Sequence, residues 1–305
     1  MYRFLLRRLV QACATVLGVI TVAFFLVRLS GNPAVVLLGP EATQADIDAL
    51  SASLGFDRPL VTQYLDFLAG AATGDLGLSL RQGLPALDLV LQRLPATAEL
   101  ALGSFALGLG LAVVTVLVIH ISGNDRIRSI VLWFGSARQA IPSFWLGLML
   151  VVVFSVILGV LPALGRNGPE SIVLPMVTIA SLEYALYVRI LDSGFTEQHG
   201  QEYVRTAYAK GQSRTAIMVR HVFPNAVLPL ITVAGLNLGA LLGGTIVVEL
   251  VYSWPGLGQL VMSSISSRDY TVVQASLFVV AVFFVLVNLL VDVLYVALDP
   301  RVRLR

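Results

Sequence analysis

The stretch Leu100–Ile119, LALGSFALGLGLAVVTVLVI, contains no charged residue over its 20 positions. A helix of about 20 apolar residues is long enough to cross the hydrocarbon core of a bilayer, which is about 30 Å thick. The surrounding chain of 305 residues is equally apolar, since 57% of its residues are hydrophobic and 12% are charged, with a mean hydropathy of +0.86. This composition excludes a soluble globular domain. The sequence therefore predicts an all-α polytopic membrane protein.

Six segments are long and apolar enough to be transmembrane helices. They are Leu9–Leu29, Leu100–Ile119, Ile130–Leu158, Ile172–Leu191, Ala226–Val251 and Val272–Leu298. The third is longer than a straight crossing requires, and Pro142 predicts a bend near its start. The first follows three arginines, as a secretion signal would. Its length and the lack of a small-residue cleavage site before Gly31 predict instead a retained span.

The distribution of arginine predicts the orientation of these spans. Basic residues precede the first segment and recur between the second and third, between the fourth and fifth, and after the last, whereas the two short loops on the other side hold only Arg166 and Arg268. Positive charge in short loops favours the cytoplasmic side. Both termini are therefore predicted to be cytoplasmic, and the long segment from Ser30 to Arg93 is predicted to lie outside.

Four parts are predicted along the chain. They are an N-terminal segment with the first transmembrane helix (1–29), a small helical extracytoplasmic cap (30–94), a five-helix transmembrane core (95–298) and a cytoplasmic tail (299–305). Within the cap, Thr43 and Asp46 predict a capping box at the start of a short helix that ends at Gly55. A second helical stretch is predicted around Leu60–Leu68.

A charged loop, residues 195–225, separates the fourth and fifth apolar segments. Within it, Tyr203–Gly211, YVRTAYAKG, has the pattern of a short amphipathic helix. Its predicted apolar face consists of Tyr203, Val204, Ala207 and Tyr208, and its polar face of Arg205, Thr206 and Lys210. An amphipathic helix at the membrane surface predicts a docking site for another protein.

Ionisable residues are few within the apolar segments, and lipid exposure of such residues is costly, so we expect them to face a bundle interior or a pathway. The candidates for a pathway are Asn237, Glu249, Asn288 and Asp292, and further ionisable residues at this depth are Glu99, Glu183, Arg189 and Asp192. Hydrogen bonding between helices is the alternative role. Small residues in the fifth segment predict close helix packing. They are Gly235, Gly239, Gly243 and Gly244.

Catalytic and metal-binding patterns are missing from the sequence. Lys210 is the one lysine and is followed by Gly211 and Gln212, so the chain has no GK[ST] phosphate-binding loop. The histidines are scattered, at His120, His199 and His221. We therefore predict no metal site and no enzyme activity. A net charge of +2 offers no field for nucleic acid, and Cys13 has no cysteine partner within the chain.

Ten stretches, in order along nearly the whole chain, resemble the membrane permease subunits of bacterial peptide/nickel/opine ABC importers, and in particular the dipeptide and oligopeptide permeases. They are MYRFLLRRL (1–9), LGFDRPLVTQY (54–64), GDLGLSL (74–80), LPATAEL (94–100), IPSFWLGLML (141–150), YVRTAYAKG (203–211), RHVFPNAVLP (220–229), GGTIVVELVYSWPGLGQL (243–260), SRDYTVVQ (267–274) and NLLVDVLYVALDPRVR (288–303). The resemblance implies the type I ABC importer permease fold with six transmembrane helices.

By this resemblance, the loop around Gly211 is the EAA segment, a coupling helix that inserts into a groove on a cytoplasmic ATPase subunit. Ala207 and Gly211 occupy its small positions. Arg205 departs from the more typical glutamate, and Pro224 stands where the peptide branch more often has arginine, which places individual ion pairs in question. The implied ATPase-coupling residues are Tyr203, Val204, Arg205, Ala207, Tyr208, Lys210 and Gly211.

The resemblance also implies the partners. A homologous second permease would complete the pathway, two ATP-binding subunits would hold ATP and Mg, and an extracytoplasmic substrate-binding protein would deliver cargo to this multi-pass subunit in the bacterial inner membrane, among its lipids. The implied docking surface or outer gate includes Trp254, Pro255, Gly256, Gly258 and Asp269. A rigid turn that joins two spans is the alternative role for this loop.

Small peptides are the leading cargo on this resemblance. Nickel or metal-chelate complexes, opines and glutathione remain alternatives, because in such systems selection resides largely in the binding protein. Two other classes fit six spans and buried acids at the level of composition, a secondary transporter and a membrane-embedded enzyme. The amphipathic loop at Gly211 favours the ATP-driven importer over both.

Overall fold

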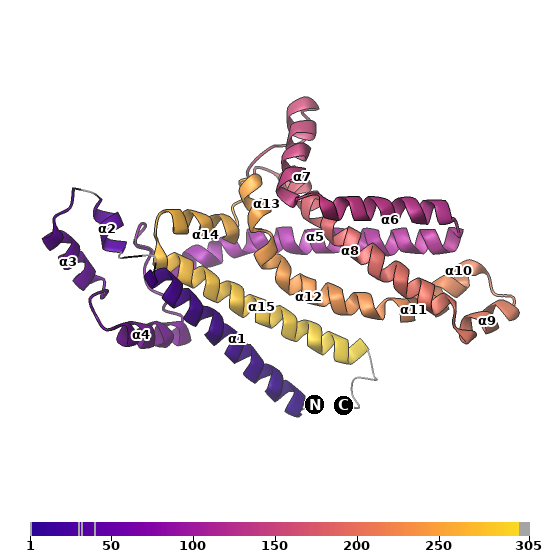
Figure 1. The fold of residues 1–305 in the computed structure, drawn as a ribbon, viewed down its shortest axis with the longest axis horizontal. Coiled ribbons are helices and arrows are strands. Elements are labelled where there is room, and N and C mark those ends of the chain that lie inside the picture. Colours follow the sequence, from indigo (N-terminus) through magenta and orange to yellow (C-terminus); the bar gives the residue numbers. More distant parts are fainter. Residues whose placement is uncertain (1, 30, 32, 40, 299–305) are drawn as a thin grey trace. The chain divides into compact units, whose positions relative to one another are not determined.

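The computed structural model describes residues 2–29, 31, 33–39 and 41–298. This part of the chain is helical, with one isolated antiparallel bridge between Leu78 and Pro85 (Figure 1). Four helices are long and apolar enough to cross a membrane, and the number reaches six if each of two bent helix pairs counts as one span. The four helices and two bent pairs correspond to the six predicted segments, which confirms the predicted fold class.

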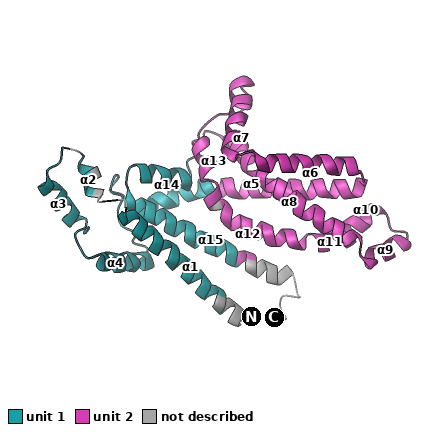
Figure 2. Cartoon of the chain, in the orientation of Figure 1, with its two compact units in different colours: residues 1–97, 255–289 teal, residues 98–254, 290–305 magenta. Residues whose placement is uncertain are grey.

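Contacts divide the chain into two compact units (Figure 2). Unit 1 comprises residues 1–97 and 255–289, and unit 2 comprises residues 98–254 and 290–305. Helix α5, Ala86–Ser122, and helix α15, Tyr270–Leu298, each contribute residues to both units. The predicted cap therefore belongs to the same contact unit as the first helix and most of the last one.

Unit 1 contains five further helices besides its parts of α5 and α15. They are α1 (Tyr2–Leu29), α2 (Pro33–Leu38), α3 (Gln44–Ser53), α4 (Leu60–Thr73) and α14 (Leu257–Ser266). Their apolar side chains meet in a buried cluster formed by Leu76, Ala86, Leu89, Val90, Leu257, Leu260, Val272, Ala275 and Val279. This core joins the region after α4 to the first part of α5, of α14 and of α15.

The start of α3 has the predicted capping box. The Thr43 side chain accepts a hydrogen bond from the Asp46 backbone, and the Asp46 carboxylate accepts one from the Thr43 backbone N–H at 3.2 Å. Gly55 follows the helix with φ +70°, a left-handed conformation that glycine adopts without steric cost. Helix α4 packs on α1 through Phe24, whose ring centroid lies 5.3 Å from that of Tyr64.

Unit 2 holds the remaining helices. They are α6 (Asp125–Ala140), α7 (Ser143–Leu150), α8 (Val173–His199), α9 (Glu202–Ala209), α10 (Arg214–Ile217), α11 (Phe223–Ala226), α12 (Leu228–Gly244) and α13 (Ile246–Val251), with π-helical turns at Val151–Ile157 and Met218–Val222 and a 3₁₀ turn at Pro169–Ile172. The core of this unit is built on α8. Its buried members are Ala112, Val116, Tyr187, Val188, Leu191, Phe195, Val204, Ala207, Ile217, Met218, Val222, Ala226, Leu230 and Ala234.

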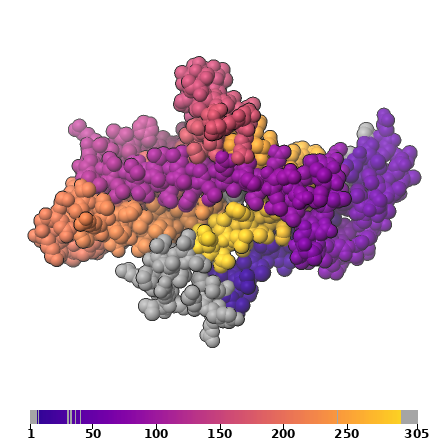
Figure 3. Space-filling model, turned by 180° about the vertical axis from the view of Figure 1, so that it is seen from behind, coloured from indigo at the N-terminus to yellow at the C-terminus, as the bar shows by residue number. Residues whose placement is uncertain are grey.

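The third predicted span, Ile130–Leu158, is a pair of helices rather than one helix. Helix α6 already begins at Asp125, and the chain turns by 103° between α6 and the segment that starts at Ser143. Pro142 lies at this bend, as expected, but the bend falls in the middle of the segment rather than in its first turn. The space-filling view shows the α7 segment protruding from the rest of unit 2 (Figure 3).

The fifth predicted span, Ala226–Val251, is also interrupted. The axis changes by 51° before α12, near Pro229, which lacks the backbone N–H that would continue the preceding turn. The close packing predicted for this segment occurs at Gly235, where a Cβ atom would overlap the side chain of Val291. At Gly243 and Gly244 no atom lies within 4 Å of such a Cβ position, so packing does not require glycine there.

Candidate functional site

The predicted coupling segment forms helix α9, which lies with α10 at the end of unit 2 where α8 terminates (Figure 1). Val204 and Ala207 are 1% and 5% exposed and belong to the same core as Phe195 of α8. Tyr203 and Tyr208, predicted on the same face, remain 39% and 41% exposed. Successive helical residues are about 100° apart. Val204 and Ala207 therefore point to the middle of the apolar face, and the tyrosines flank it.

The outward face of α9 is polar and accessible. Arg205 and Glu202 form an exposed ion pair one turn apart, with Nη1 to Oε1 at 3.0 Å. The residues after the helix, Lys210 to Gln212, are exposed as well. The hydroxyl of Tyr203 donates to Gln198 Oε1 at 2.9 Å, and partial burial raises the pKa of this tyrosine, with a smaller opposing effect from the Asn225 amide.

Gly211 ends α9 in a defined geometry. Its φ is +75°, its N–H donates to Tyr208 O at 2.9 Å, and the N–H of Gln212 donates to Ala207 O at 3.3 Å. This pair of bonds is the Schellman arrangement, which satisfies the last carbonyls of a helix. No atom lies within 4 Å of a Cβ position at Gly211, so the backbone conformation alone requires glycine. Ser213 then caps α10 by accepting a hydrogen bond from the Ala216 N–H at 3.3 Å.

An ion pair between the half-buried Arg128 and the buried Asp192 joins α6 to α8 close to the coupling segment. Arg128 donates from Nε to Asp192 Oδ1 and from Nη2 to Asp192 Oδ2, both at 2.9 Å. His120 Nε2 lies 3.0 Å from Asp192 Oδ1, and the His120 ring stacks on Phe195 at 4.7 Å. Arg214 of α10 donates from Nε to the His120 carbonyl at 2.8 Å, which attaches the coupling segment to the end of α5. His120, Arg128 and Arg214 line a cavity of about 280 Å³.

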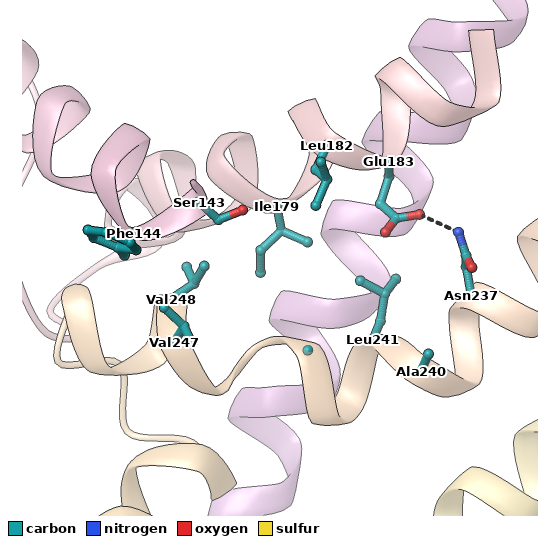
Figure 4. A pocket seen from close by; sticks show the side chains of 11 residues that line it. Ser143, Phe144, Ile179, Leu182, Glu183, Asn237, Ala240, Leu241, Val247 and Val248 are labelled. Carbon is teal, nitrogen blue, oxygen red and sulfur yellow. Dashed lines mark hydrogen bonds between the residues drawn. The ribbon is translucent and has the colours of Figure 1, made fainter. Parts of the chain in front are cut away.

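A second cavity, of about 410 Å³, opens between α7, α8, α12 and α13 of unit 2 (Figure 4). We call it the Glu183 pocket. Its lining is Ser143, Phe144, Ile179, Leu182, Glu183, Asn237, Ala240, Leu241, Gly244, Val247 and Val248. Most of these residues are apolar, and Ser143, Glu183 and Asn237 supply the polar groups. The Asn237 side chain donates from Nδ2 to Glu183 Oε2 at 3.1 Å, which joins α12 to α8 across the pocket.

The other predicted pathway residues lie in different surroundings. Glu249 is fully buried and accepts a hydrogen bond from the Thr245 hydroxyl at 3.1 Å, one turn earlier. Asn288 donates to Phe284 O at 2.8 Å within its own helix. The side chain of Asp292 lies outside the described residues. Asn237 is therefore the predicted pathway residue that the structure places in the Glu183 pocket. Its partner Glu183 is one of the further intramembrane acids for which the sequence predicts a bundle interior or a pathway.

The predicted outer-gate residues are mostly buried. Within unit 2, the Trp254 side chain is buried, and the Arg166 guanidinium lies 5.7 Å from its ring centroid. The backbone N–H of Trp254 donates to the backbone carbonyl of Glu249 at 2.8 Å. Within unit 1, Gly256 and Gly258 are buried and Pro255 is half-buried.

Asp269 is also a buried member of this group. It accepts hydrogen bonds from the Ser79 hydroxyl at 2.5 Å and from the Leu80 N–H at 3.1 Å. These bonds tie the start of α15 to the segment that precedes α5. A role for these residues in docking stays a prediction.

Metal-binding geometry is missing from the described residues, since no group of three or more His, Cys, Asp or Glu side chains there could hold an ion. The two polar centres are instead an ion pair and a carboxylate–amide contact. Neither places a nucleophile next to a base.

This chain belongs to the family of binding-protein-dependent transport system inner membrane components. The family model matches residues 104–304, and the model of the N-terminal membrane component of such systems matches residues 1–101. The resemblance inferred from the sequence is therefore confirmed. The chain is the non-catalytic permease subunit of a bacterial ABC importer, a multi-pass membrane protein, and ATP binding lies in partner ATPase subunits.

Individual relatives support this assignment. The chain is 36% identical over 304 residues to the glutathione transport system permease protein GsiC of Escherichia coli O6:H1 (strain CFT073), covering 99% of both proteins. It is 35% identical to GsiC of Escherichia coli strain K12, again covering 99% of both. Family membership removes the secondary transporter and the membrane-embedded enzyme from the alternatives.

Solved structures show the same fold. An inward-facing form of the MetNI methionine ABC transporter aligns with a TM-score of 0.58 and 17% identity, over 69% of this chain and 96% of that chain. An amino acid ABC transporter crystallised with histidines aligns with a TM-score of 0.52 and 15% identity, over 70% of this chain and 94% of that chain. At these identities the likeness concerns the fold alone.

Proposed function

We propose that this chain forms half of the translocation pathway of an ATP-driven importer of small peptides or peptide-like molecules. A homologous second permease forms the other half, two ATPase subunits bind at the cytoplasmic face, and an extracytoplasmic binding protein delivers the cargo. The chain lies in the bacterial inner membrane with both termini in the cytoplasm. Helix α9 and the turn at Gly211 receive the movement of an ATPase subunit.

One observation carries the proposal, the two-sided construction of α9. Its inner side is fixed in the core of unit 2 by Val204 and Ala207, whereas Arg205, Tyr208 and Lys210 are exposed. A helix built in this way can bind a partner on one face while the other face passes the displacement to α8. ATP binding shifts the pathway between two states only if the ATPase subunit binds α9 differently in those states. A rigid connection between α9 and α8 transmits this difference to the pathway.

The experiment measures ATP hydrolysis stimulated by the loaded binding protein in the reconstituted complex. Tyr208→Ala and Arg205→Glu change exposed groups of α9 and leave Val204 and Ala207 in place. We expect both variants to assemble and to lose most of the stimulation. Arg126→Ala removes an exposed arginine from α6 as a matched control and should leave stimulation unchanged. Normal stimulation in both α9 variants, with intact assembly, would refute the coupling role.

The cargo class rests on the relatives. Two full-length relatives are named as glutathione transport permeases. Glutathione is itself a small peptide-like molecule, so it joins short peptides as the leading cargo. Uptake of labelled glutathione and labelled dialanine by the reconstituted complex, with and without ATP, tests this class. Uptake of neither compound, together with uptake of a nickel chelate or an opine, would transfer the assignment to one of those cargoes.

Docking of the binding protein is proposed for the cap and the outer loop. Because Trp254 is buried, the neighbouring Ser253, which is exposed and has φ +48°, is the better position for a cross-linking probe. Ser253→Cys should form an adduct with the binding protein during the transport cycle. If no adduct forms at any stage, the loop is a rigid connection between two spans.

A further inference from the structure

The Glu183 pocket contains a carboxylate whose charge is not balanced by a cation. Glu183 accepts a hydrogen bond from the Asn237 amide and interacts with the Tyr187 hydroxyl one turn later on α8, and no Arg, Lys or His side chain in the described part of the chain pairs with it. An ionised carboxylate has about four acceptor positions on its two oxygens. The Asn237 amide and the Tyr187 hydroxyl occupy at most two of them, and neither group supplies a positive charge. The remaining positions are free to accept hydrogen bonds from a solute.

The surroundings make this free charge unusual. Glu183 is half-buried on α8, within a helix that is apolar and long enough to cross a membrane, and eight of the other lining residues of its pocket are apolar. A charge at such depth is costly unless it faces a partner or a water-filled cavity, and it usually marks a solute pathway. Apolar walls also strengthen the attraction between the carboxylate and a cation that enters the pocket.

Close packing behind Glu183 fixes its backbone. A Cβ atom at Gly108 of α5 would lie 3.1 Å from Glu183 Cβ and 2.9 Å from the carbonyl oxygen of Ala180. Helices α5 and α8 therefore touch directly at this point. Helix α5 therefore packs against the backbone of α8 at Glu183, and the Asn237 amide on α12 binds the carboxylate (Figure 4).

The pocket suits an organic ammonium. Its volume of about 410 Å³ lies within the range of about 300–1,000 Å³ that is usual for small-molecule sites. Apolar side chains such as Ile179 and Val248 can contact an aliphatic group, and the carboxylate can accept the compact donors of a primary ammonium. Short peptides and glutathione both carry such a group at their amino end at neutral pH.

We propose that Glu183 is a cargo-selecting residue that binds the primary ammonium group of the solute during its passage. The inference rests on the proposed function, since it requires that cargo passes along this face of unit 2. It adds a selection step within the permease, separate from the selection made by the binding protein. Asn237 acts as a positioning residue, because it holds the carboxylate and carries no charge.

The test measures binding to the permease–ATPase complex without the binding protein, so that selection by that protein does not enter. Radiolabelled dialanine and N-acetyl-dialanine are compared by equilibrium dialysis at pH 7, because acetylation removes the ammonium and leaves the rest of the solute. We expect the wild-type complex to bind dialanine at least about tenfold more tightly, as for a charge-assisted hydrogen bond. In Glu183→Gln this ratio should approach one.

Two controls make the result specific. Glu170→Gln removes an exposed carboxylate elsewhere in unit 2 and should leave the ratio unchanged. Glu183→Asp keeps the charge and should keep most of the preference. Equal binding of the two probes by the wild type, no measurable binding of either, or an unchanged ratio in Glu183→Gln would overturn the proposal.

A competing occupant of the pocket is a cationic side chain of the second permease. In that case Glu183→Gln would lower the apparent Tm of the complex and leave the ratio of the two probes unchanged, which also overturns the proposal. Failure of the proposed function shows separately, as normal stimulation of ATP hydrolysis in the α9 variants. A complex can therefore lose its ammonium preference while its coupling to ATP remains intact.

Discussion

Arg128 donates two hydrogen bonds to the buried carboxylate of Asp192, from Nε to Oδ1 and from Nη2 to Oδ2, each at 2.9 Å. The pair joins α6 to α8, and Thr196 accepts a further hydrogen bond from Nη2 at 3.1 Å. Bidentate pairing supplies both the charge and the planar geometry that a carboxylate needs away from water. The end of α8 that leads into α9 is thereby fixed.

Removing this arginine should destabilise the protein measurably. In Arg128→Ala the side chain of Asp192, which is 6% exposed, keeps only His120 as a partner. Breaking a buried pair costs about 3–5 kcal/mol, and because Arg128 is itself 36% exposed we expect about 2 kcal/mol. The measurement is the apparent Tm of the purified protein in detergent. Arg126→Ala, an exposed neighbour, is the control, and an equal Tm for the two variants would contradict the prediction.

Gly211→Ala should weaken the end of α9 for a conformational reason alone. Its φ of +75° costs an L-residue about 1–2 kcal/mol, and no neighbouring atom obstructs a methyl group. Asn tolerates this region better, so Gly211→Asn should recover part of the loss. Hydrogen exchange of the α9 amides reports the change. The control is Gly110→Ala, which changes a helical glycine with equally open space. This variant should slow amide hydrogen exchange slightly or leave it unaltered.

Ser79→Ala should loosen the junction between the cap and α15. The substitution removes the hydroxyl that donates to Asp269 Oδ2 at 2.5 Å, and both residues are 3% exposed. A buried acceptor that loses its donor costs about 1–3 kcal/mol. Limited proteolysis around Gly83, in the turn that follows Ser79, should become faster. The control variant Ser53→Ala, which changes an exposed hydroxyl at the end of α3, should be cleaved by the protease at the wild-type rate.

The capping box of α3 should make the cap sensitive to acid. Hydrogen bonds from the Thr43 side chain and backbone lower the pKa of Asp46 below its ordinary value of 3.8. A carboxyl whose folded pKa is lowered stabilises the folded state above its unfolded pKa, and this contribution disappears as the pH falls through the lower folded value. The hydrogen-exchange rate of the α3 amides, corrected for intrinsic rates, should therefore rise relative to that of the α4 amides as the pH is lowered below about 4. Thr43→Ala should raise α3 exchange at pH 7 and abolish this pH dependence.

Local signals in the sequence predict local structure well. The capping box at Thr43 and the helix end at Gly55 appear as expected, because each depends on the conformation of neighbouring residues. The length and apolar character of the segments also predict six spans, which correspond to four helices and two bent pairs in the structure. The family assignment follows from motifs spread over the whole length, and the comparisons confirm it.

Local sequence signals do not predict contacts between residues that are distant in the sequence. The apolar character of Ile130–Leu158 gives no angle for the bend at Pro142, since the direction depends on what α7 packs against. The pairing of Arg128 with Asp192, 64 positions apart, and of Glu183 with Asn237, 54 positions apart, depends on how helices cross. An acid within an apolar span was the available clue in both cases. It indicates that a partner or pathway is needed but does not identify it.

Anchoring α9 in the core of unit 2 has a mechanical consequence. Val204 lies in the same buried cluster as Leu191 and Val222, which flank it on the preceding and following helices. Close-packed protein interiors compress very little. A force applied to the exposed side of α9 is therefore transmitted through rigid packing and is not lost in a flexible linker. The helices on both sides must move with α9.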